Sequence, residues 1–121
     1  MEKITMEQLS AQMKAYVKME EELEFSHFCA YYQDVMNCLQ ADYQDLTSDD
    51  LVQAQAICGI MCENAKMRAA KKDANRKKFQ KMQEKSDFWQ DAIKARLKKE
   101  GMSEDELKQK TEELWADAPA S

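Results

Sequence analysis

The apolar residues of this chain recur every three or four positions, and this period predicts a protein made of helices. Leu9 and Met13 start one apolar stripe, and Phe28 starts another at the same spacing. The first segment is therefore expected to be helical over residues 5–44. Between the two stripes, glutamates occupy positions where a continuous stripe requires apolar residues, which predicts a bend or break near residues 20–26; one uninterrupted helix is the alternative.

A further apolar stripe starts at Leu51 and keeps its spacing for about four turns. It predicts a long helix over residues 47–85, antiparallel to the first segment and similar to one helix of a coiled coil. The register falls on polar residues for about two turns in its second half, which indicates a part of the helix that leaves the core. Ser86 followed by Asp87 is a sequence at which a new helix can start, so we expect a C-terminal helical hairpin over residues 87–117.

Three copies of one local pattern mark helix starts, at Thr5, Thr47 and Ser103. In each copy the hydroxyl residue follows an apolar residue and precedes an acid or amide by three positions. This is the layout of a capping box, in which the hydroxyl and the later side chain each accept a hydrogen bond from the other residue's main-chain amide. Gly101, followed by Met102, has the position of a left-handed residue that ends a helix.

The chain is therefore predicted to be all-α, a small bundle of three to five helices in one domain over residues 1–121. It has 121 residues, two Gly and one Pro, and 34% of its residues are charged, which is typical of long surface-exposed helices. The expected arrangement is a long antiparallel helical pair with a C-terminal helical hairpin.

Composition also sets expectations about the compartment. No run of residues is apolar enough for a membrane span, and the first residues lack the layout of a secretory signal, so we expect no membrane partner and a cytoplasmic location. The four Cys are expected to be free thiols in a reducing compartment, because helices of this kind form without disulfides.

Charge is unevenly distributed around a net value of −5. Residues 1–65 carry three Lys and twelve acids, a net charge of −9, and residues 66–85 carry nine Lys or Arg and two acids, a net charge of +7. On one continuous helix, six lysines of this basic stretch fall within about 140° of arc and are candidates for binding an anion or nucleic acid. They are Lys66, Lys71, Lys77, Lys78, Lys81 and Lys85.

An acidic pI of about 5.0 argues against nucleic acid, since modules that bind it are usually basic overall. The basic stretch is as well suited to pair with the acidic segments of its own chain or of a second copy.

Two weak patterns are compatible with a metal. Cys58 and Cys62 lie four residues apart, on one face of a helix, and supply half of a soft-metal site. Glu24 and His27 have the three-residue spacing found in di-iron bundles. For both pairs we favour a structural interpretation without a metal, in which the thiols pack in the core and the histidine is solvated.

The C-terminal third contains several large apolar residues, including both tryptophans. They are either core or the anchors of an interface. The interface candidates are Phe88, Trp89, Ile93, Leu97, Leu107, Leu114 and Trp115.

These observations predict a non-enzymatic module for protein–protein interaction, such as an adaptor, a chaperone or a regulatory subunit, that self-associates and needs no cofactor. The chain has one His and no glycine-rich phosphate loop, so most acid–base and nucleotide chemistry lacks its usual residues. The alternatives are a nucleic-acid-binding regulator that uses the basic stretch, and a metal-binding or redox bundle.

Overall fold

The computed structural model describes residues 5–18, 24–71 and 74–115, with the side chains of residues 17, 18 and 115 left out. Within these ranges the chain forms helices and turns and no strand. The helices are α1 (Met6–Lys18), α2 (Phe25–Asp42), α3 (Ser48–Ala69), α4 (Arg76–Lys99) and α5 (Glu104–Trp115), and a 3-10 turn, η1 (Tyr43–Asp45), follows α2. The prediction of an all-α bundle of three to five helices is confirmed.

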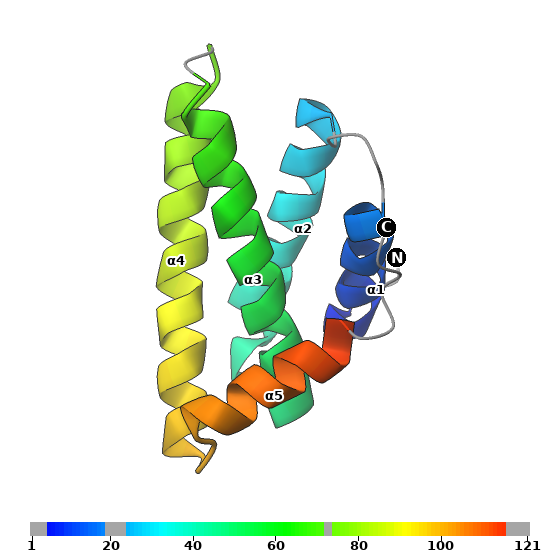
Figure 1. Cartoon of the computed structure of the whole chain (residues 1–121), viewed down its shortest axis with the longest axis vertical. Helices are drawn as coiled ribbons and strands as arrows, with labels where there is room; N and C mark the ends of the chain where they lie inside the picture. The colour runs from blue at the N-terminus through cyan, green and yellow to red at the C-terminus, as the bar shows by residue number, and fades with distance from the viewer. Residues whose placement is uncertain (1–4, 19–23, 72–73, 116–121) are drawn as a thin grey trace.

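Helix α3 lies at the centre of the bundle. It runs beside α4, and α1 and α5 pack against it from other directions (Figure 1). Ten of its residues are buried on more than one side, as expected for a helix surrounded by others. The predicted stripe has no exposed surface, and its members are Leu51, Ala54, Cys58, Met61 and Ala65.

The predicted helix starts are confirmed by their hydrogen bonds. The Asp50 amide donates to Oγ1 of Thr47 at 3.1 Å, and the Thr47 amide donates to Oδ2 of Asp50 at 3.3 Å. Thr5 makes the same reciprocal pair with the residue three positions later, at 3.1 and 2.9 Å. Oγ of Ser103 accepts a hydrogen bond from the amide three positions later at 3.1 Å. These bonds satisfy amides that the first turn of a helix leaves without partners.

The predicted end of α4 at Gly101 is also confirmed. Gly101 has a φ of 102°, a left-handed conformation that favours glycine. The Met102 amide donates to the carbonyl of Leu97 at 2.9 Å, and the Gly101 amide donates to the carbonyl of Lys98 at 3.0 Å. This pair of bonds defines a Schellman motif, which turns the chain from α4 into α5.

The prediction of one helix over 47–85 is wrong, because α3 ends at Ala69 and a separate helix, α4, begins at Arg76 and runs beside it. The stretch in which the predicted register falls on polar residues is the stretch where α3 ends and α4 begins. Folding back places Phe79 and Ile93 in the core, and a straight helix would leave both outside it. The predicted new start at Ser86 is wrong as well, since this residue is fully buried within α4.

The first segment, predicted over 5–44, contains two helices, so the predicted break near residues 20–26 is correct and the alternative of one uninterrupted helix is wrong. Glu24, just before α2, has a ψ of 150°, which is not helical. The C-terminal part also differs from the expected hairpin over 87–117. Helix α5 crosses α3 near its first turns, and does not run back along α4 (Figure 1).

Candidate interaction surface

A groove between α2 and α4 brings together members of two residue sets that the sequence identified separately. Its volume is about 660 Å³. From the basic set it contains three lysines, and from the set of interface candidates it contains Phe88. The residues that line it are Tyr32, Lys78, Lys81, Met82, Glu84, Lys85 and Phe88.

Phe88 is the most exposed aromatic residue of this groove, with 62% of its surface accessible. Its ring lies edge-on to Trp89, with 5.6 Å between centroids, and Trp89 lies 5.3 Å from the ring of Tyr43. The Tyr43 hydroxyl donates to the main-chain carbonyl of Ala92 at 3.3 Å. Phe88 is thus the outer end of an aromatic row that the bundle supports, and such supported aromatic rings are typical anchors of protein interfaces.

Three of the six other interface candidates are core residues. Ile93 and Leu97 are 0% and 1% exposed, and Leu107 is buried where α5 meets the bundle. Leu114 is half-buried, and the side chain of Trp115 lies outside the described residues. As an interface set, the prediction is therefore wrong for the three buried residues, because folding α4 and α5 against α3 already covers them.

The basic stretch does not form the single helical face that we predicted. Lys66 lies on α3, four of the lysines lie on the separate helix α4, and Lys71 lies in a turn just after the end of α3. One cation of the stretch points inward: Arg68 is buried, with its guanidinium 4.5 Å from the centroid of the Phe28 ring. The stretch therefore divides into two groups of lysines. Lys66, Lys71 and Lys77 lie near the end of α3 and the start of α4, and we call this region the basic hairpin end. Lys78, Lys81 and Lys85 line the groove beside Phe88.

An acidic pocket lies at the N-terminal end of α3, opposite the end that carries Lys66. Its volume is about 350 Å³, and its carboxylates come from Glu7, Asp42, Asp45 and Asp50. Sequence reasoning identified residues 1–65 as acidic but did not predict this cluster, since the four residues come from three separate segments. The signal available in the sequence was the run of acids around the start of α3.

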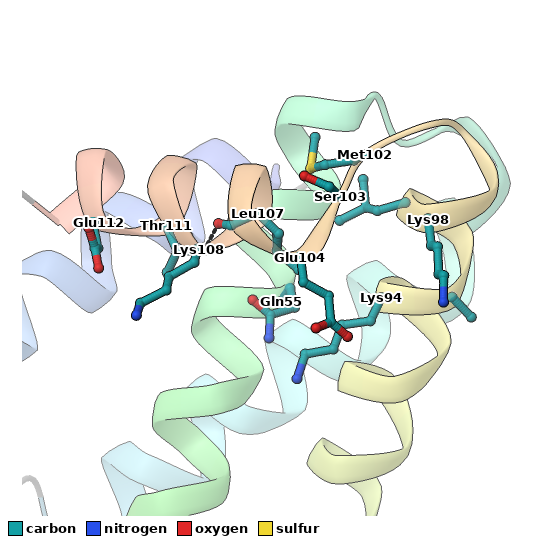
Figure 2. Close-up of a pocket in the computed structure, with 12 residues that line it drawn as sticks. Gln55, Lys94, Lys98, Met102, Ser103, Glu104, Leu107, Lys108, Thr111 and Glu112 are labelled. Atoms are coloured by element: carbon teal, nitrogen blue, oxygen red, sulfur yellow. Dashed lines mark hydrogen bonds between the residues drawn. The ribbon is translucent and has the colours of Figure 1, made fainter.

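A third pocket, of about 500 Å³, lies between α3, α4 and α5. Figure 2 shows its lining side chains, which come from all three helices. Leu97 and Leu107 provide apolar surface, and both signs of charge are present, with Lys94 and Glu104 among them. The mixed charge does not favour one class of ligand.

The cysteine and histidine candidates are not brought together. Cys58 is fully buried, and burial raises the pKa of its thiol to about 12. Sγ of Cys62 donates to the carbonyl of Gln83 at 3.7 Å, whereas Glu24 and His27 are exposed at the start of α2. Among the residues that the structure describes, no three of the types His, Cys, Asp and Glu form a group that could hold a metal ion.

Within the described ranges, none of the helices has the length and apolar character needed to cross a membrane. Comparison of the chain with protein-family models, with curated proteins and with solved structures gives no match.

Proposed function

We propose that this chain is a non-enzymatic helical module for protein–protein interaction, of the kind that serves as an adaptor, a chaperone or a regulatory subunit, and that it self-associates. The observation that carries this proposal is the exposure of Phe88 in a groove lined by lysines. Aromatic residues are enriched at the core of protein interfaces and among the residues that contribute most to binding. Among the described residues, Met67 is the one other large apolar side chain as exposed as Phe88, at 65% against 62%.

The thiols support the non-enzymatic part of the proposal. The thiolate is the form of cysteine that attacks substrates and binds metals. Burial raises the pKa of Cys58, Cys29 and Cys62, and for Cys29 the nearby charges of Lys78 and Arg68 oppose that rise only in part. All three side chains are therefore less ionised at neutral pH than an exposed cysteine.

Self-association is supported by opposite charges at the two ends of α3. Asp50 lines the acidic pocket at one end, and Lys66 belongs to the basic hairpin end. Asp50 and Lys66 are sixteen positions apart in the sequence, which corresponds to about 24 Å of helix. In an antiparallel pair of copies related by a two-fold axis, each basic end faces an acidic end, so the same contact forms twice.

Sedimentation velocity at increasing ionic strength tests self-association. We expect a dimer at low salt that dissociates as salt is added, because exposed charges are screened. Charge reversal at the basic end, Lys66→Glu with Lys77→Glu, is expected to give a monomer. The matched control, Lys98→Glu with Lys99→Glu, changes two exposed lysines at the other end of α4 and is expected to leave the dimer intact. A monomer at every salt concentration contradicts the proposal.

Nucleic-acid binding is a second candidate function, favoured by the lysines at the hairpin end. Lys66, Lys71 and Lys77 are all exposed there. Under this alternative, Lys77→Glu with Lys81→Glu abolishes binding to labelled duplex or single-stranded probes and leaves helicity unchanged. Absence of binding by the wild-type chain at low salt excludes it.

A further inference from the structure

The groove beside Phe88 has an apolar surface, and among the described residues that form this surface Phe88 is the most exposed. Tyr32 of α2 and Met82 and Phe88 of α4 provide this surface. Tyr32 and Met82 are each 9% exposed, so they form the floor, and the Phe88 ring projects beyond them. A partner side chain that enters here gains contact with three apolar groups at once, which is the usual environment of an anchor residue.

A row of positive charge accompanies this apolar surface. Lys78, Lys81 and Lys85 precede Phe88 at intervals of three, four and three residues, so all four lie along one side of α4. The one acid in the lining, Glu84, leaves the groove with a net positive charge of two. All three lysines are exposed, and Nζ of Lys78 lies 5.7 Å from the centroid of the Phe25 ring.

We propose that this groove binds an acidic amphipathic helix of a partner protein. This inference rests on the proposed function and names the chemistry of the partner. Carboxylates of the incoming helix meet the lysine row, and one apolar side chain of the helix packs on Phe88, Tyr32 and Met82. Opposite charge selects the acidic helix and speeds its approach, and the buried anchor supplies most of the affinity.

The dimensions of the groove suit a short helix. Lys78 and Phe88 are ten residues apart, which is about 15 Å along α4 and close to three helical turns. Six of the seven lining residues belong to α4 and one, Tyr32, belongs to α2. An incoming helix packs its ridges of side chains mainly against those of α4.

Fluorescence anisotropy with synthetic peptides tests the inference on the full chain. The probe is a labelled helical peptide with glutamates at positions i, i+3 and i+7 and a leucine anchor on the adjacent face. Two control peptides differ from it in one property each: lysines replace the glutamates in the first, and serine replaces the anchor in the second. We expect binding of the acidic probe, weakening with salt, and at least about tenfold weaker binding of both controls.

Variants of the chain locate the site. Phe88→Ser and the double variant Lys81→Glu with Lys85→Glu are each expected to weaken the acidic probe about tenfold or more. Met67→Ser is the matched control for the first, because Met67 is equally exposed on another helix. Lys98→Glu with Lys99→Glu is the control for the second. All the substituted residues are exposed, so circular dichroism is expected to report unchanged helicity.

Equal binding of the acidic and basic peptides overturns the inference, as does full affinity in Phe88→Ser. Loss of self-association in Phe88→Ser would assign the groove to a second copy of the chain, and this too overturns the inference while the proposed self-association stands. Conversely, a chain that remains monomeric but binds the acidic probe through Phe88 supports the inference and removes self-association from the proposed function.

Discussion

The guanidinium of Arg96 donates a hydrogen bond to the main-chain carbonyl of Leu46 at 3.1 Å, and this bond ties α4 to the connection between α2 and α3. The same group donates to the carbonyl of Tyr43, lies 4.9 Å from the centroid of the Tyr43 ring, and pairs with Glu100 at 3.3 Å. The end of a helix leaves carbonyls without helical partners. Arg96 satisfies them from a neighbouring helix, so one side chain holds three elements together.

Arg96→Ala is expected to lower the free energy of unfolding by about 2–3 kcal/mol, because partly buried carbonyls lose a charged donor. The free energy of unfolding of Arg96→Lys is expected to lie between those of Arg96→Ala and the wild type, since one ammonium group cannot reproduce the planar set of donors. Urea denaturation measures both. Lys99→Ala, exposed on the same helix, is the control and is expected to stay within about 0.5 kcal/mol of the wild type. A loss that small for Arg96→Ala would contradict this role.

The two glycines are expected to respond to alanine in opposite directions. Gly101→Ala places a side chain at a φ of 102° and is expected to destabilise the chain by about 1 kcal/mol or more. Gly59 lies within α3, and a Cβ added there meets nothing closer than the Gln90 side chain at 3.9 Å. Gly59→Ala is therefore expected to stabilise by about 0.5–1 kcal/mol. Denaturation midpoints that shift in the same direction would contradict this account.

Ser86→Ala is expected to stabilise the protein by about 1 kcal/mol. Ser86 has no exposed surface, and within the described part of the chain its hydroxyl has no hydrogen-bond partner. A buried polar group in that state destabilises the fold, and alanine removes it with little change in volume. Thermal denaturation is the measurement. Ser26→Ala, at an exposed position of α2, is the control and should leave Tm nearly unchanged. A lower Tm for Ser86→Ala would show that the hydroxyl is satisfied.

Stability is expected to fall as the pH rises above about 9. Burial raises the pKa of Cys58 from 9.0 to about 12 and also raises the pKa of Tyr31. In this range the unfolded chain releases protons that the folded chain keeps, so unfolding becomes more favourable, by up to about 1.4 kcal/mol per pH unit for one such group. Below pH 9 both states are protonated at these groups, and their contribution is constant.

Thermal melting from neutral pH to about pH 11 measures this effect. Cys58→Ala is expected to flatten the alkaline part of the curve, and Cys62→Ala, at a half-buried position, to change it less. An equal slope in the wild type and in Cys58→Ala would contradict the assignment to this thiol.

The sequence predicts helix ends well where a local motif determines them. Thr47 with Asp50 and Gly101 with Met102 need only residues within one turn, and each forms the predicted bonds. The sequence between α3 and α4 contains no Pro or Gly, and the two helices are separate because Phe79 and the apolar residues after it are buried when α4 packs against α3. Ser86 shows the converse error, since a serine can cap a helix or lie buried inside one, and tertiary packing decides between them.

The candidate site was predictable in some of its residues but not in its assembly. Phe88 and Lys85 are close in sequence, and both were identified as surface candidates. Tyr32 belongs to an apolar stripe that reads as core, and its place at the groove depends on how α2 packs beside α4. Ile93 and Phe88 are both apolar residues of α4, yet one is fully buried and the other is 62% exposed, and the difference depends on which side of α4 meets α3.

Native mass spectrometry of the full chain, purified without added metal, tests the proposed self-association and the absence of a cofactor together, because one spectrum reports both stoichiometry and retained ligands. We expect a dimer of twice the 14.1 kDa chain mass with no additional mass. A stoichiometric metal or ligand on the chain would contradict it and direct attention to Cys58, Cys62 and His27, and a monomer at all concentrations would contradict the proposed self-association.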